Sequence, residues 1–285
     1  MRQEARIVTD SSCDLPPESL QELGIEVVPL TVTFGAEEYR DGEITMDEFW
    51  AKAAGPHPPR TSQPSLGDFV MVFERLVAEG RRVLCVTITG KHSGTFNAAR
   101  LAAEGFGEKV HVFDSLSTSL GLGYQVLQAA LAARAGGATQ HLAESLEELR
   151  SRMHLMIVLD TLDSLRRGGR ADAFITIAER MTRLLNLKVI INMVEGQLKL
   201  EGAARSLRGA LARVQDNVAH LGPLEALAVI HARNPRLAEQ VADELAKRLG
   251  FPRERIWVRE TGAALASHAG PGVVGVMAVP RARPA

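Results

Sequence analysis

Residues 82–95 read RVLCVTITGKHSGT, a nearly continuous apolar run followed by glycine and hydroxyl-bearing residues. Such a run is typical of a strand that is covered on both faces, as in a parallel sheet with helices on either side. A helix is expected from about Ser93, and Gly94 would let the backbone come close to a ligand. The segment therefore predicts a buried parallel strand that leads into a helix.

Short strands and helical stretches alternate around this segment. Residues 6–9 form one expected strand, and residues 110–113 form another before a long Ala- and Leu-rich helix through Ala133. Ser65 and Asp68 have the spacing of a capping box at a helix start. This alternation predicts an α/β domain with a parallel sheet in the first half of the chain.

The second half of the chain follows a different order. The dipeptide Glu195-Gly196 lies between two strand-like runs and predicts a hairpin. Helices are expected at residues 206–220 and 236–249, between further strands. The order predicts an α+β domain with a mixed or antiparallel sheet, so we expect two domains, 1–152 and 153–285. The expected strands of the second domain are 154–159, 188–194, 197–201, 224–231, 255–260 and 272–279.

Composition and charge exclude several classes of protein. The 285 residues are 46% apolar with a formal net charge of −1, and no basic stripe points to nucleic acid or an anionic membrane surface. Cys13 and Cys85 have no disulfide or metal-site spacing. We expect no signal peptide, because Met1 to Asp14 has no apolar h-region, and the longest apolar runs stop far short of the roughly 20 residues that span a bilayer. We expect a soluble, cytoplasmic protein without a metal.

Polar residues follow three of the predicted parallel strands. They are the groups Asp10-Ser11-Ser12, Thr89 to Thr95, and Asp114-Ser115 with Ser117 and Ser119. Ligands of parallel α/β sheets bind beyond the carboxyl ends of the strands, which favours a binding role. Ser, Thr and Asp are also the preferred residues at helix starts, so a capping role stays open for the Asp10 and Asp114 groups.

The tripeptide Ser93-Gly94-Thr95 is the most specific of these groups. The first amides of a helix point outward there beside two hydroxyls, an arrangement that suits an anion. A phosphate-binding loop is excluded, because Lys91 is not followed directly by Ser or Thr. A dinucleotide fingerprint at Gly121 and Gly123 is excluded as well, because Val126 stands where the third glycine belongs.

Two alternative functions stay open on the residues alone. Ser93, Asp160 and His268 occur in the chain order of an α/β-hydrolase triad, although the G-x-S-x-G elbow is missing. A serine esterase using Ser93 and His268 is one alternative, and a small phospho-ligand-binding module is the other. His268 is expected in a Gly- and Pro-shaped loop before the last strand, where small neighbours favour contact with a ligand.

Six segments form an ordered set: Val8 to Ser12, Thr61 to Ser65, Ser93 to Phe96, Asp114-Ser115 with Gly121 and Gly123, Leu165 to Arg170, and His268 to Gly272. In this order they resemble the DegV family, over about residues 6–279. The resemblance implies one bound long-chain fatty acid in a tunnel between the two domains, lined mostly by aliphatic side chains because aromatic residues make up only 5%. It also implies no cofactor.

The resemblance further implies roles for individual residues and a partner. Thr61, Ser93 and His268 would contact the fatty acid carboxylate, supported by the neighbouring Ser62, Gly94 and Thr95. The chain would have no catalytic residue of its own. It would present the carboxylate to a separate DAK-type fatty acid kinase, which forms the acyl phosphate used in phospholipid synthesis. Arg170 would lie near the acyl phosphate, and Arg205 would help to dock the kinase.

Overall fold

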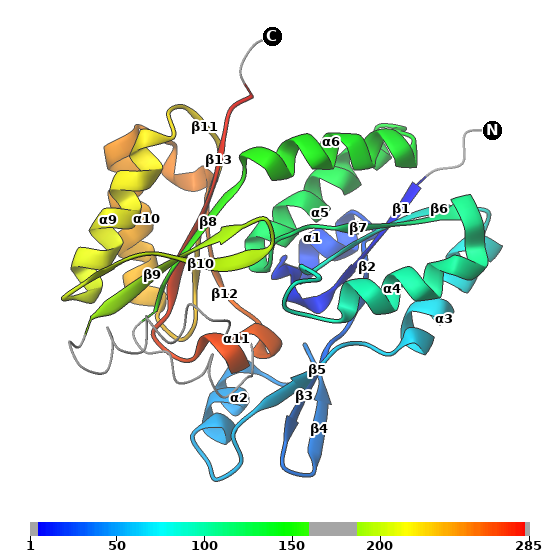
Figure 1. The fold of residues 1–285 in the computed structure, drawn as a ribbon, viewed down its shortest axis with the longest axis horizontal. Helices are drawn as coiled ribbons and strands as arrows, with labels where there is room; N and C mark the ends of the chain where they lie inside the picture. The colour runs from blue at the N-terminus through cyan, green and yellow to red at the C-terminus, as the bar shows by residue number, and fades with distance from the viewer. Residues whose placement is uncertain (1–4, 160–186, 283–285) are drawn as a thin grey trace. The chain divides into compact units, whose positions relative to one another are not determined.

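A computed structural model of the chain describes residues 5–159 and 187–282 (Figure 1). The chain forms two compact units. Unit 1 comprises Met1–Ser151 and Gly262–Ala264, and unit 2 comprises Arg152–Thr261 and Leu265–Ala285. The division expected from the sequence contained no such return of Gly262–Ala264 to the first unit.

Unit 1 is built on a four-stranded parallel sheet in the order β2-β1-β6-β7. This confirms the parallel sheet that the sequence predicts. The apolar run of β6 is buried from Val83 onward, as expected for a strand covered on both faces. The strands are β1 (Ala5–Asp10), β2 (Glu26–Val28), β6 (Arg82–Thr87) and β7 (Val110–Asp114).

Helices bury the apolar residues of this sheet. Phe69 and Phe73 of α3 pack in one core cluster with Val8, Cys85 and Ala99 of β1, β6 and α4. Helix α5 packs against β1, β6 and the short helix η1. Ser65 and Asp68 form the predicted capping box before α3. Apart from the helix that packs with the second sheet, the described helices of unit 1 are η1 (Ser11–Cys13), α1 (Pro17–Glu22), α3 (Leu66–Ala78), α4 (Thr95–Ala103), η2 (Glu104–Lys109), α5 (Ser119–Arg134) and α6 (Thr139–Arg152).

A second, three-stranded antiparallel sheet of unit 1 has the order β4-β3-β5. The ring of Phe34 on β3 lies 5.7 Å from that of Phe49 on α2, and both side chains are buried. Strands β4 and β5 were not predicted, because their polar residues do not alternate with apolar ones. The elements are β3 (Thr31–Phe34), β4 (Glu37–Arg40), α2 (Met46–Ala53) and β5 (Arg60–Ser62).

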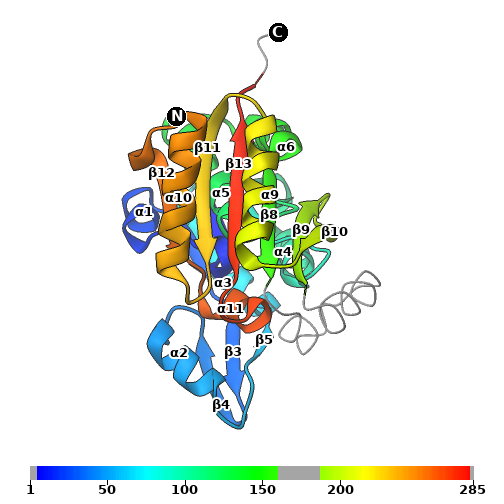
Figure 2. The ribbon, with the colours of Figure 1, turned by 90° about the vertical axis from the view of Figure 1, so that its left-hand side faces the viewer.

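Unit 2 is a six-stranded mixed sheet in the order β10-β9-β8-β13-β11-β12 (Figure 2). Among the strand pairs of the described residues of this unit, only β11–β12 is parallel, which confirms the predicted mixed sheet and hairpin. Helices α9 and α10 pack on one face. The elements are β8 (His154–Leu159), β9 (Lys188–Val194), β10 (Gln197–Ala204), α9 (Leu207–His220), β11 (Leu224–His231), α10 (Pro235–Leu249), η3 (Arg253–Arg255), β12 (Ile256–Glu260), α11 (Ala263–Ala269) and β13 (Val274–Pro280).

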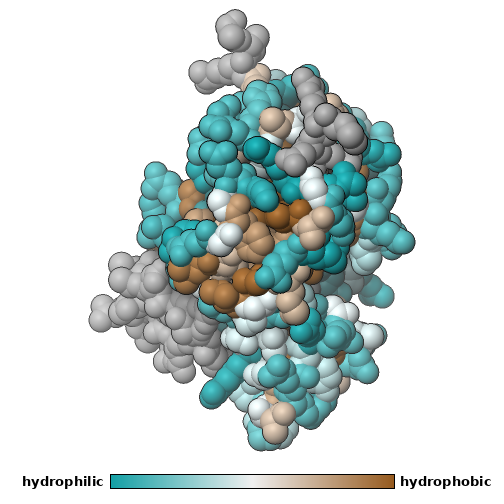
Figure 3. All heavy atoms as spheres, turned by 90° about the vertical axis from the view of Figure 1, so that its right-hand side faces the viewer, coloured by the Kyte–Doolittle hydropathy of each residue, from teal (hydrophilic) through white to brown (hydrophobic). Residues whose placement is uncertain are grey.

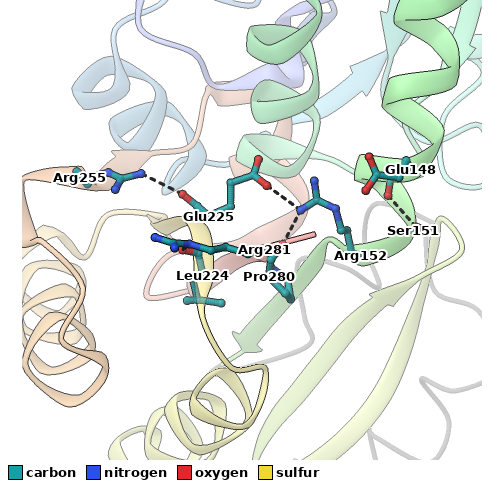
Figure 4. A network of polar contacts seen from close by, with 8 residues as sticks. All are labelled: Glu148, Ser151, Arg152, Leu224, Glu225, Arg255, Pro280 and Arg281. Atoms are coloured by element: carbon teal, nitrogen blue, oxygen red, sulfur yellow. Dashed lines mark hydrogen bonds and ion pairs between the residues drawn. The ribbon is translucent and has the colours of Figure 1, made fainter. Parts of the chain in front are cut away.

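A polar network joins three neighbouring strands of this sheet (Figure 4). Arg152, just before β8, lies 2.8 Å from the Glu225 carboxylate on β11 and 2.5 Å from the Pro280 carbonyl on β13. Arg281 donates to the Leu224 carbonyl. The last strand, β13, therefore lies between β8 and β11 and is tied to both.

Candidate functional site

The carboxyl ends of β1, β6 and β7 meet at one edge of the parallel sheet. The Ile88 amide after β6 donates to the Asp10 carboxylate at the end of β1, at 2.7 Å. The Gly90 amide donates to the carboxylate of Asp114 at the end of β7, at 3.1 Å. The three polar groups that the sequence placed after these strands are therefore neighbours in unit 1.

The carboxylates of Asp10 and Asp114 hold loop backbone. Asp10 is fully buried and also accepts hydrogen bonds from the Ser12 amide and hydroxyl. Asp114 accepts from the Leu116 amide at 2.9 Å. Backbone amides thus occupy both carboxylates, which favours the structural role for these two residues over ligand contact.

Burial gives the Asp10 carboxyl a distinct pH dependence. Desolvation raises its pKa from 3.8 to about 6. Between these two pH values the folded protein keeps a proton that the unfolded chain has already lost. At about 1.4 kcal/mol per pKa unit, Asp10 should destabilise the fold by about 3 kcal/mol as pH rises from 4 to 7. We expect wild type to lose this amount relative to Asp10→Asn in urea denaturation. A difference that stays constant with pH would contradict this.

The loop that carries Ser93 begins helix α4. Ser93 Oγ lies 2.8 Å from Thr95 Oγ1 and accepts a hydrogen bond from the Thr95 amide at 3.3 Å. Gly94 occupies the N-cap position, without a capping side chain. Ser93 is half-buried, Gly94 is exposed and Thr95 is buried. The half-buried hydroxyl of Ser93 thus lies at a helix start whose N-cap residue, Gly94, is exposed.

The segment around Thr61 lies against this loop. Thr61 pairs with Val32 within the three-stranded sheet, and the chain then runs to Gln63. A methyl group on Gly94 would lie 1.7 Å from Gln63 Oε1, so only glycine leaves this amide in place. Within unit 1, Gln63, which follows Thr61 and Ser62 in the chain, therefore lies against Gly94.

His268 lies in helix α11 of the second half of the chain, so the predicted loop is wrong at this position. The sequence AALASHA of α11 is rich in alanine, the strongest helix former, and the helix ends only at Gly270, whose φ is 76°. The Gly-Pro-Gly turn follows the helix rather than including His268. The imidazole is half-buried.

Two carboxylates that the sequence did not single out bind the start of α11. The Gly262 amide donates to Asp14 at 2.9 Å, and the Ala264 amide donates to Asp41 at 3.2 Å. Both contacts lie within unit 1. Burial raises the pKa of the Asp41 carboxyl. No local sequence pattern indicates these contacts. The φ of 52° at Asp14 is visible only in the structure.

Close packing explains why glycine occupies position 123, one of the two glycines that resemble part of a dinucleotide motif. A methyl group on Gly123 would lie 2.3 Å from the Cys13 carbonyl oxygen in η1. The glycine therefore lets α5 approach the η1 backbone closely. Cys13 itself is buried, which raises the pKa of its thiol to about 12.

The remaining predicted residues lie elsewhere. Arg205 is exposed in unit 2, next to Ser206, which caps α9 by accepting from the Gly209 amide at 3.1 Å. Arg170 and Asp160 lie outside the described residues. No group of three His, Cys, Asp or Glu side chains in residues 5–159 and 187–282 could hold a metal ion.

Apolar side chains gather near the centre of one face of the molecule, with hydrophilic ones around them (Figure 3). Within the described part of the chain, the exposed large apolar side chains belong to unit 1, namely Leu66, Met71, Leu101 and Leu131.

No helix in the described part of the chain is both long and apolar enough to cross a membrane.

Known proteins resemble this chain over nearly its whole length. The model of the family described as "Uncharacterised protein, DegV family" matches residues 4–281. A "DegV domain-containing protein" of Deinococcus radiodurans is 36% identical over 284 residues, covering 96% of this chain and 98% of the relative.

Solved structures share the fold. The structure titled "Fatty Acid Binding of a DegV family Protein from Thermus thermophilus" has 34% identity and a TM-score of 0.86, and the match covers 98% of this chain and all of that one. The structure titled "DegV, a fatty acid binding protein from Bacillus subtilis" has 25% identity and a TM-score of 0.85, with the same coverage.

Proposed function

This chain belongs to the DegV family, and we propose that it binds one long-chain fatty acid. The observation that carries the proposal is the similarity to the fatty-acid-binding Thermus thermophilus protein, at 34% identity and a TM-score of 0.86 over 98% of the chain. A common fold over that length provides the same framework for the same class of ligand.

The proposed carboxylate site consists of Thr61, Ser93 and His268, with Ser62, Gly94 and Thr95 in support. Two hydroxyls and an imidazole can donate hydrogen bonds to a carboxylate without a full counter-charge. The half-buried Ser93 hydroxyl at the start of α4 supports this role, because helix starts favour anions. The contact between Gln63 and Gly94 supports placing Thr61 in the same site.

Most of the proposed binding energy comes from the acyl chain. At about 0.8 kcal/mol per buried methylene, a chain of about sixteen methylenes contributes roughly 13 kcal/mol before the entropic costs of binding. The polar site therefore orients the ligand and selects a carboxylate, while the tail supplies affinity.

The proposal extends to a role in acyl phosphate formation. In this role the chain is a binding subunit without catalytic residues of its own. It presents the carboxylate to a separate DAK-type kinase in the cytoplasm, and the acyl phosphate then enters phospholipid synthesis. Arg170 would contact the acyl phosphate, and Arg205 would contact the kinase. The exposure of Arg205 in unit 2 suits a contact with a partner protein.

Lipid analysis of the purified protein tests fatty-acid binding. We expect native mass spectrometry to show one acyl chain per protein molecule, and solvent extraction to release a long-chain fatty acid. After delipidation, added oleate should restore the bound mass. A protein that is empty after expression in a lipid-replete host, and that also fails to take up oleate, would contradict the proposal.

Two measurements separate the alternative functions. A serine esterase predicts that a fluorophosphonate probe labels Ser93, whereas a binding protein predicts no labelling. A phospho-ligand module predicts that small sugar phosphates raise the melting temperature and that palmitate and oleate do not. We expect the reverse, because a ligand that binds only the folded state stabilises it.

A further inference from the structure

The start of α11 is fastened by two carboxylates that are distant in sequence. The Gly262 amide donates to Asp14 at 2.9 Å, and the Ala264 amide donates to Asp41 at 3.2 Å. The first amides of a helix have no partner within the helix, so these carboxylates supply acceptors that the helix lacks. Residues at the head of α11 therefore belong to unit 1 through specific hydrogen bonds.

Both carboxylates are themselves held in place. Ser11 Oγ donates to Asp41 Oδ2 at 2.8 Å and accepts from the Leu30 amide at 3.0 Å. Ser119 Oγ donates to Asp14 Oδ2. Asp14 and Ser119 have φ values of 52° and 51°, a region that non-glycine residues rarely occupy. Strained residues that bond to each other point to a site whose geometry matters for function.

His268 lies one helical turn beyond Ala264 in the same helix. Because α11 has only seven residues, it is too short to be stable alone, and its position depends on what holds its two ends. Asp14 and Asp41 hold the first end. Beyond the second end, the Gly272 amide donates to the Ala232 carbonyl at 2.8 Å. A shift of the first end would therefore move the imidazole.

We infer that Asp14 and Asp41 are positioning residues that fix α11 so that His268 can bind the ligand carboxylate. This inference rests on the proposed fatty-acid binding through His268. Neither carboxylate needs to contact the ligand, since each acts through the backbone of α11.

A double-mutant cycle separates positioning from general stabilisation. Asp41→Ala should weaken oleate binding about tenfold, the value of roughly one hydrogen bond, when measured by isothermal titration calorimetry. In a His268→Ala background the same substitution should change the dissociation constant by less than about twofold, because the group that it positions is gone. Asp41→Asn keeps an oxygen for the Ala264 amide and should restore most of the affinity.

Glu48→Ala is the matched control. Glu48 is an acidic residue of unit 1 that accepts from the Thr45 amide and hydroxyl at the start of α2, at 3.1 and 2.7 Å. It makes no described contact with α11, so oleate affinity should stay within about twofold of wild type. Equal losses for Asp41→Ala in both backgrounds would overturn the inference.

A second readout needs no fatty acid. In the ligand-free protein, Asp41→Ala and Asp14→Gly should each shift the imidazole carbon resonance of His268 in NMR spectra, and Glu48→Ala should not. Glycine removes the Asp14 carboxylate and tolerates the φ of 52° at this position. If wild type fails to bind oleate, the proposed function fails while this readout still tests the positioning. If Asp41→Ala does not fold, Asp14→Gly provides the same comparison at the other carboxylate, with Asp14→Asn as the variant that keeps an acceptor for the Gly262 amide. An unchanged His268 resonance in folded Asp41→Ala or Asp14→Gly protein would overturn the inference.

Discussion

Replacing Gly123 with alanine is expected to lower the free energy of unfolding by about 3 kcal/mol. The new methyl group would lie 2.3 Å from the Cys13 carbonyl oxygen and 3.2 Å from Leu15 Cγ. A backbone oxygen cannot rotate away as a flexible side chain can, so η1 and α5 must separate. The gain of about 1 kcal/mol in helix propensity does not offset this. Urea denaturation followed by circular dichroism measures the loss.

Gly105→Ala is the control for this substitution. Gly105 lies in η2 of the same unit, and a methyl group there would have no neighbouring atom within 4 Å. Its stability should change by less than about 1 kcal/mol, in either direction. Equal stability of the Gly123 and Gly105 variants would show that α5 does not need to approach η1 so closely.

Replacing Ser93 and His268 together with alanine is expected to weaken fatty-acid binding by about 100-fold or more. A hydrogen bond to a charged group is worth about 1.5–3 kcal/mol, and the double variant removes two proposed donors to the carboxylate. The loss of the Ser93 contact with the Thr95 amide should cost only about 1 kcal/mol of stability. Displacement of a fluorescent fatty acid and urea denaturation measure the two effects separately.

The matched control for this pair is Ser145→Ala with His141→Ala on α6. The control removes the same two side-chain types from exposed positions that are joined by a hydrogen bond from Ser145 Oγ to the His141 carbonyl, at 2.9 Å. Its affinity for the fatty acid should equal that of wild type. If the Ser93 and His268 variant also bound as tightly as wild type, the proposed carboxylate site would be wrong.

Features with a local signal could be predicted from the sequence. The apolar run of residues 82–89 predicted β6, because such a run is typical of a strand covered on both faces. The Glu195-Gly196 turn predicted the β9–β10 hairpin, and Ser65 with Asp68 predicted the start of α3. In each case the interacting residues are a few positions apart, so the pattern contains the interaction.

Other features were missed for two different reasons. Leu142, Leu146 and Leu149 have helical spacing and would have predicted α6, so that signal was present but unused. The glycines and proline after His268 outweighed the alanine-rich AALASHA, which led to the wrong prediction of a loop. The leucine spacing of α6 and the alanine content of α11 are both local signals, and the second is recognised when helix propensity is weighed against the turn residues that follow.

The contacts of Asp14 and Asp41 with the head of α11 could not be predicted from local patterns. Their partners, Gly262 and Ala264, are 248 and 223 positions away. An aspartate near a turn has the same local pattern whether it caps its own loop or a distant helix. Only the three-dimensional fold distinguishes these two roles.

The return of Gly262–Ala264 to unit 1 has a consequence for synthesis on the ribosome. Domains of nascent chains generally fold in the order in which they emerge. Here Asp14 and Asp41 are translated more than two hundred residues before the amides that donate to their carboxylates. Strand β13, which fills the gap between β8 and β11, is made later still. Unit 1 can therefore complete its contacts only after most of unit 2 has been translated, and the sheet of unit 2 is complete only once β13 has emerged.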